Sequence, residues 1–152
     1  MEILSRFISA VIGALGFAFL FHVRPGRLIF SCFAGLLAYG VYALAVFYGG
    51  SLFLCNIAAA AVATLCADIM AVIFKCPATV FLTVSVTPLV PGSSLYYTLS
   101  NFVFWNSVSF TKNILDTIHI GLGIAVGIII TSAIFDAFMR MFNNFQKFKI
   151  LE

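Results

Sequence analysis

Two stripes of hydroxyl and amide side chains meet at a double-proline motif, Pro88-Leu89-Val90-Pro91-Gly92, in the middle of an apolar segment. Each stripe has one residue every four positions, which places its side chains on one helix face. The stripes consist of Thr79, Thr83 and Thr87 before the motif and of Ser93, Tyr97 and Asn101 after it. Because proline has no N–H and glycine admits conformations closed to other residues, the motif is expected to break the helix. The backbone N–H groups that start the second half then suit an anion.

This combination predicts a binding site for a small solute. Non-helical backbone at membrane depth is tolerated only where it is buried in protein or lines a cavity, and broken helices recur as the binding element of secondary transporters. We expect a carboxylate of the solute to face the helix start at Ser93 and Ser94. The predicted substrate-binding residues are Thr83, Thr87, Pro88, Pro91, Gly92, Ser93, Ser94, Tyr97 and Asn101. The alternative is a plain proline kink in a helix that only packs against its neighbours.

A second candidate is Asp68, the one acid well inside a predicted span. It shares a helix face with Asn56, Ala60 and Thr64, which precede it at intervals of four. A charged side chain at the centre of a membrane helix costs about 2.5–3.5 kcal/mol, so we expect Asp68 to be protonated, paired or facing water. It is either a proton-coupling group or a carboxylate that pairs with Lys75, seven residues later.

The other polar residues give weaker indications of a functional site. Asp116 and His119, at the outer end of the last apolar stretch, form part of a proton access path or lie in a solvated loop. The four cysteines have no C-x-x-C spacing and the two histidines stand alone, so the sequence predicts neither a metal site nor a cofactor. Without a nucleophile–base pair or a paired carboxylate set, we do not expect an enzyme.

The elements that must position these residues lie in a bilayer. Of the 152 residues, 63% are hydrophobic and 9% are charged, which is too few charges to cover a water-facing surface. The net charge of +3 comes from single basic residues at the ends of apolar runs, so neither nucleic-acid binding nor disorder is expected.

A membrane-spanning helix needs about 20 apolar residues, and five stretches meet this requirement. They are residues 3–23, 28–47, 52–74, 78–104 with a break at 88–92, and 114–141. The predicted fold is therefore an all-α integral membrane protein, a single transmembrane domain over residues 1–152 with five helices, the fourth broken at the PLVPG motif.

The basic residues favour five crossings over a re-entrant fourth segment. Five crossings place six Lys and Arg residues on one side and two on the other, whereas a re-entrant segment gives four on each side. Because cytoplasmic loops carry the excess of Lys and Arg, we predict an outer N-terminus and a cytoplasmic C-terminus.

Small residues predict where the helices touch. Ala59, Ala63 and Ala67 form a ridge on the third span, and Gly123 and Gly127 stand four residues apart in the fifth. Such residues let membrane helices approach closely, so we assign all five to helix packing.

Several motifs resemble the threonine/serine exporter family, specifically its small, separately encoded membrane component. They are Pro77-Ala78-Thr79-Val80-Phe81, Thr87-Pro88-Leu89-Val90-Pro91-Gly92-Ser93 and Tyr96-Tyr97-Thr98, with an acid nine positions before Pro77. The resemblance implies a bacterial inner-membrane exporter of threonine, serine or related small carboxylates, driven by the proton gradient. It also implies a partner, the larger membrane component, which would form an inverted repeat with a five-span chain, and it allows higher oligomers.

Two other functions fit the same residues. In one, the chain is a structural or assembly subunit without a substrate path, and its polar stripes hold helices to a partner. In the other, it is a homo-oligomeric channel in which Asp68 contributes to a pore ring.

Overall fold

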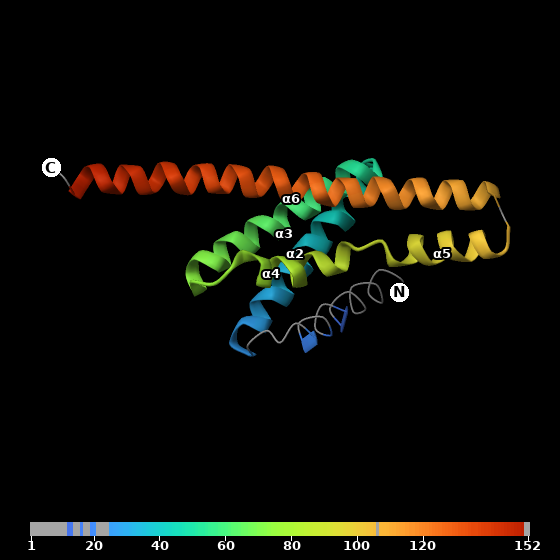
Figure 1. The fold of residues 1–152 in the computed structure, drawn as a ribbon, viewed down its shortest axis with the longest axis horizontal. Coiled ribbons are helices and arrows are strands. Elements are labelled where there is room, and N and C mark those ends of the chain that lie inside the picture. The colour runs from blue at the N-terminus through green and yellow to red at the C-terminus, as the bar shows by residue number, and fades with distance from the viewer. Residues whose placement is uncertain (1–11, 14–15, 17–18, 21–24, 106, 151–152) are drawn as a thin grey trace.

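The computed structural model of the chain describes residues 12–13, 16, 19–20, 25–105 and 107–150, and these residues form helices and no strand. The elements are α2 (Pro25–Phe47), α3 (Leu52–Phe74), α4 (Ala78–Val86), the short 3-10 turn η1 (Thr87–Leu89), α5 (Gly92–Val103) and α6 (Ser107–Ile150) (Figure 1). The first predicted span, 3–23, lies largely outside the described residues.

Three helices are long and apolar enough to cross a membrane. They comprise residues Ile29–Phe47 of α2, Leu52–Phe74 of α3 and Val108–Phe142 of α6. A fourth apolar stretch consists of Ala78–Leu89 and Gly92–Val103, which are bent by 58° relative to each other. The chain is therefore an all-α, multi-pass membrane protein.

The last helix is longer than the apolar stretch that predicts it. The sequence indicates 114–141, but α6 begins at Ser107 and continues to Ile150. The polar residues ahead of the apolar stretch stay helical because α6 packs there against α5, where the Phe102 and Phe110 rings lie 5.7 Å apart. At 1.5 Å per residue the helix is about 66 Å long, and it extends past α3 at both ends (Figure 1).

Local signals set the turns on either side of α3. Gly49 adopts a positive φ of 78° in the turn after α2, a conformation that glycine adopts without strain. Ser51 caps α3, and its Oγ accepts a hydrogen bond from the Leu54 N–H at 3.4 Å. At the other end, Lys75 is left-handed with φ 50°, and Pro77 two residues later precedes α4. These tight turns make consecutive helices run in opposite directions.

Contacts between non-consecutive helices show that α2 and α4 run in the same direction. The Ser85 hydroxyl donates to the Phe81 carbonyl at 2.9 Å and lies 3.4 Å from the Ser31 carbonyl. One turn further along α2, Gly35 faces Ser85 and Pro88. Residues later in α2 therefore contact residues later in the segment formed by α4 and η1, as is the case for two helices that run in the same direction.

In the same way, α3 and α6 share a direction. Gly123 of α6 faces Asn56 of α3, and Gly127, one turn later, faces Ala60, also one turn later. The segment between these two helices must consequently begin at one end of the bundle and finish at the other.

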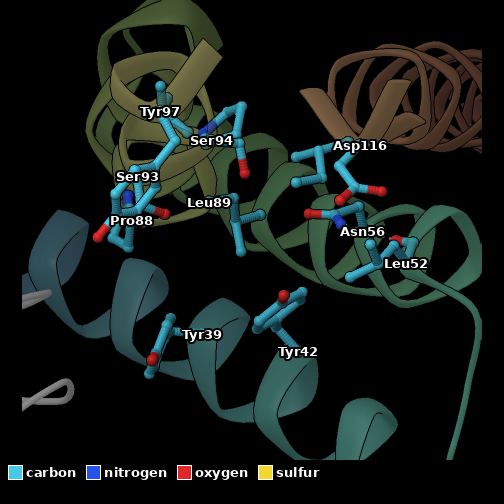
Figure 2. A pocket seen from close by; sticks show the side chains of 13 residues that line it. Tyr39, Tyr42, Leu52, Asn56, Pro88, Leu89, Ser93, Ser94, Tyr97 and Asp116 are labelled. Atoms are coloured by element: carbon cyan, nitrogen blue, oxygen red, sulfur yellow. Dashed lines mark hydrogen bonds between the residues drawn. The ribbon is translucent and has the colours of Figure 1, made fainter. Parts of the chain in front are cut away.

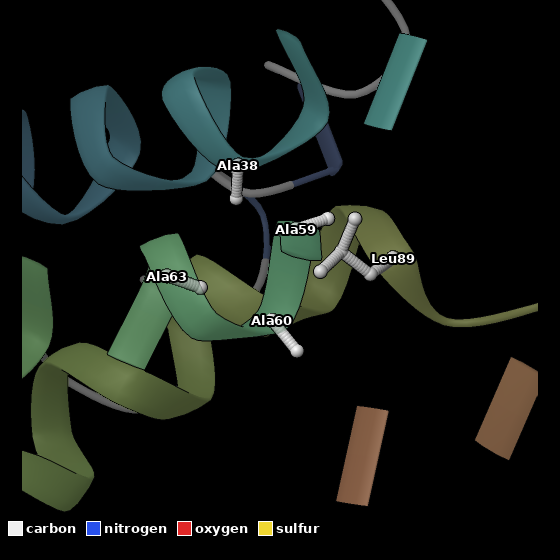
Figure 3. Packing of buried hydrophobic residues seen from close by; sticks show 5 residues of the cluster. All are labelled: Ala38, Ala59, Ala60, Ala63 and Leu89. Carbon is white, nitrogen blue, oxygen red and sulfur yellow. The ribbon is translucent and has the colours of Figure 1, made fainter. Parts of the chain in front are cut away.

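Alanines make α3 the helix on which the others pack. One buried cluster joins α2, α3 and η1, and its members are Ala38, Ala59, Ala60, Ala63 and Leu89 (Figure 3). Ala67 is also fully buried. Because lipid gives no hydrophobic drive for helix association, close backbone approach and van der Waals packing must hold such helices together.

The α3–α6 contact gives a test with a matched control on one helix. A Cβ on Gly127 would lie 2.7 Å from the Ile57 carbonyl oxygen and 2.9 Å from the Ala60 Cβ, whereas a Cβ on Gly121 would meet nothing within 4 Å. Gly127→Ala should therefore destabilise the protein by about 1–3 kcal/mol through overpacking. Gly121→Ala should not. Thermal unfolding in detergent measures both, and equal melting temperatures would contradict this packing.

Candidate functional site

The helix break is built by the two prolines. Pro88 and Pro91 have no N–H to donate, and Val90 is extended (φ −60°, ψ 128°), as residues before proline prefer. The Gly92 N–H reaches back to the Val90 carbonyl at 2.8 Å, across Pro91 at φ −77° and ψ 58°. This is an inverse γ-turn. It redirects the chain before α5 begins.

The break lies level with the middle of two long helices. Gly35, near the centre of the 23-residue α2, stands against Pro88, since a Cβ there would be 3.4 Å from the Pro88 Cγ. Leu89 packs with Ala60 and Ala63, near the centre of the 23-residue α3. Because both helices are long enough to span a bilayer, the irregular backbone lies near the middle of the bundle along its length.

A cavity of about 610 Å³ opens beside the break. This volume falls in the range of about 300–1,000 Å³ typical of small-molecule sites. Residues of α2, α3, η1, α5 and α6 surround the cavity (Figure 2). Its polar lining consists of Tyr39, Tyr42, Asn56, Ser93, Ser94, Tyr97 and Asp116.

The start of α5 forms one wall of this cavity. No side chain caps the helix. The Leu95 N–H bonds to the Pro91 carbonyl at 3.0 Å, but the backbone N–H groups of Ser93 and Ser94 have no acceptor within the described part of the chain. Since unpaired N–H groups and the helix dipole place partial positive charge at a helix N-terminus, this wall attracts an anion.

The opposite wall carries oxygen atoms. Asn56 is 1% exposed, and its Nδ2 donates to the Leu52 carbonyl at 2.7 Å. Figure 2 shows its oxygen directed toward the cavity and Asp116 beside it, across from Ser93 and Ser94. The site therefore combines an anion-attracting wall with a wall that attracts a cation.

The structure brings some of the predicted binding residues together and not others. The predicted residues that line the cavity are Pro88, Pro91, Ser93, Ser94 and Tyr97, whereas Gly92 and Asn101 are not in the lining.

Thr83 and Thr87 lie on a separate, mostly apolar groove with Ile128. Their hydroxyls donate to the Thr79 and Thr83 carbonyls at 2.7 and 2.8 Å. Such back-bonding within a helix is usual for threonine, and the bend turns this stripe away from the cavity.

Asp68 also lies outside the cavity. It is 9% exposed, its Oδ2 is buried, and that oxygen has no hydrogen-bond partner among the described residues. Asp68 follows Asn56 by twelve residues, about 18 Å along the helix axis. The face between them packs on α6 at Asn56 and Ala60. The polar stripe is thus a buried seam between α3 and α6, with the cavity at one end and Asp68 at the other.

Sequence reasoning missed the contribution of α2. Tyr39 and Tyr42 line the cavity, and both are partly buried. The sequence held a signal for them. Tyrosines are most frequent at membrane interfaces, so two tyrosines in the middle part of an apolar segment are unusual and indicate polar surroundings. Their hydroxyls need polar surroundings at that depth.

A water-filled cavity predicts different reactivity for neighbouring positions of α5. Ser94 lines the cavity, whereas Leu95 does not and is 43% exposed. In a background without the four native cysteines, Ser94→Cys should react with a charged methanethiosulfonate reagent, and Leu95→Cys should not, because the reactive thiolate requires water. A rate at Ser94→Cys as low as that at Leu95→Cys would show that the cavity is closed to water.

A sequence model described as "Threonine/Serine exporter, ThrE" matches residues 6–134, which is most of the chain. The chain matches no curated protein and no solved structure. The match covers the broken helix, the seam between α3 and α6, and every polar residue of the cavity. The chain therefore belongs to the threonine/serine exporter family.

Proposed function

We propose that this chain is a subunit of a secondary transporter that exports threonine, serine or a related small carboxylate across a bacterial inner membrane. The observation that carries the proposal is the cavity at the break, where the uncapped start of α5 faces a partly polar space of about 610 Å³. Discontinuous helices hold anionic substrate groups in this manner in secondary transporters. The carboxylate binds at the Ser93 and Ser94 amides.

The proposed topology has five spans. The shared direction of α3 and α6 supports a fourth segment that crosses the membrane, since a re-entrant segment would leave these two helices antiparallel. Lys75 and Arg140 lie toward the same ends of α3 and α6, which the positive-inside rule puts in the cytoplasm. The cavity then opens in the outer half of the bundle, where an exporter releases its substrate.

Asp68 is the proposed proton carrier. A carboxyl group that is buried and lacks a partner on one oxygen can exchange a proton without first breaking an ion pair. Its position at the far end of the α3–α6 seam separates the proton site from the substrate cavity. Movement of α6 against α3 connects the two sites.

The proposed partner is the larger membrane component of the same family. A chain with an odd number of spans pairs with a five-span half of opposite orientation as an inverted repeat. Alternating access then arises from motion of one half against the other. The exposed apolar faces of α2 and α6, with Phe33 and Ile134 as examples, face lipid or this partner.

Transport in proteoliposomes that contain the chain and its partner tests these roles. Asp68→Asn should reduce gradient-driven threonine flux to the level of protein-free liposomes, yet leave threonine counterflow, because counterflow needs no net proton movement. Pro91→Ala should reduce both by straightening the break. Pro77→Ala, at the exposed turn before α4, is the matched control and should retain both.

Undiminished gradient-driven flux in both Asp68→Asn and Pro91→Ala would contradict the proposed site. Wild-type flux that ignores the proton gradient would favour a channel. Co-purification with the partner, combined with unaltered transport in both variants, would favour a purely structural subunit.

A further inference from the structure

We infer that Asp116 is the receptor for the protonated amino group of the substrate, so that the cavity selects zwitterionic amino acids over carboxylates that lack an amine. The inference rests on the proposed function of the cavity as a substrate site. It adds a specificity-determining residue on α6, a helix that contributes none of the binding residues expected from the sequence.

The first argument for this inference comes from the charges that line the cavity. Among the described residues that line the cavity, Asp116 is the one that carries a charge. Within the described residues it has no ion-pair partner, although Lys112 and His119 lie one turn away on either side. A cationic group on a ligand can therefore form a charge-assisted hydrogen bond with the Asp116 carboxylate.

The second argument comes from the hydrogen-bonding groups of Asn56 and does not depend on charge. Its side chain is almost completely buried, and its amide nitrogen is already used by the Leu52 carbonyl at 2.7 Å. The remaining oxygen points into the cavity beside Asp116 (Figure 2). An amide oxygen at the cavity wall accepts hydrogen bonds from a ligand, and an ammonium group has three donors to share between Asn56 and Asp116.

The two walls together define the ligand class. The Ser93 and Ser94 amides, across the cavity, accept a carboxylate, while Asp116 and Asn56 accept an ammonium group. A free α-amino acid carries both groups on one carbon. A hydroxy acid of the same size carries only the first, and it would leave Asp116 facing an uncharged hydroxyl.

Equilibrium binding to the full-length chain in nanodiscs of phosphatidylethanolamine and phosphatidylglycerol tests the inference. The probes are L-serine and glycerate, in which a hydroxyl replaces the ammonium group. Wild type should bind serine more tightly than glycerate by about tenfold or more, the usual effect of one charge-assisted hydrogen bond. Asp116→Asn, which keeps the shape and removes the charge, should lower this ratio to about one. Lys112→Gln, which removes a charge outside the cavity lining, should leave the ratio unchanged.

The outcomes separate this inference from the proposed function. If wild type binds serine and glycerate equally, or if Asp116→Asn weakens both equally, the cavity remains a carboxylate site and Asp116 is not the amine receptor. If wild type binds neither probe, the proposed substrate site fails and the inference fails with it. A ratio that falls in Asp116→Asn and holds in Lys112→Gln supports both.

Discussion

Backbone polar groups inside a bilayer need partners, because hydrocarbon offers none. Within the described chain, α2, α3 and α6 meet this requirement by helical hydrogen bonds along their length. The segment from Pro88 to Gly92 does not, since two of its residues lack an N–H and the amides that follow have no acceptor. A polar cavity at this depth meets the requirement, and Tyr39, Asn56 and Asp116 supply its other walls.

Close packing elsewhere holds the first half of the break, Pro88 and Leu89, against α2 and α3. Small residues at the contacts bring three neighbours onto α3, with Ala38 on one side and Gly127 on the other. Gly35 lets α2 approach Pro88, since a Cβ there would already stand at van der Waals contact, 3.4 Å from the Pro88 Cγ. The irregular segment therefore sits between regular helices that hold its position, and the polar groups of the cavity are set by elements far apart in the sequence.

Hydropathy and turn residues were sufficient to predict most of the helix limits. Of the seven polar residues that line the cavity, however, the substrate-binding prediction included only Ser93, Ser94 and Tyr97. The apolar stretch 52–74 corresponds to α3, and the helix interruption falls at the two prolines. The side of the bundle that each stripe faces could not be read from spacing, because a 58° bend changes it: Tyr97 lines the cavity and Thr87 does not. Asp116 was predicted to lie in a proton access path or in a solvated loop, since no local pattern relates it to Ser94 twenty-two positions earlier.

The length of α6 has a mechanical consequence. This rod touches α3 through Gly123 and Gly127, with Asp116 on one side of that contact and Arg140 on the other. Close backbone approach at the two glycines holds the middle of α6 against α3. Because α6 is one continuous helix from Ser107 to Ile150, a force on its Asp116 end is carried along the rod to its Arg140 end, so the two faces of the bundle are mechanically connected.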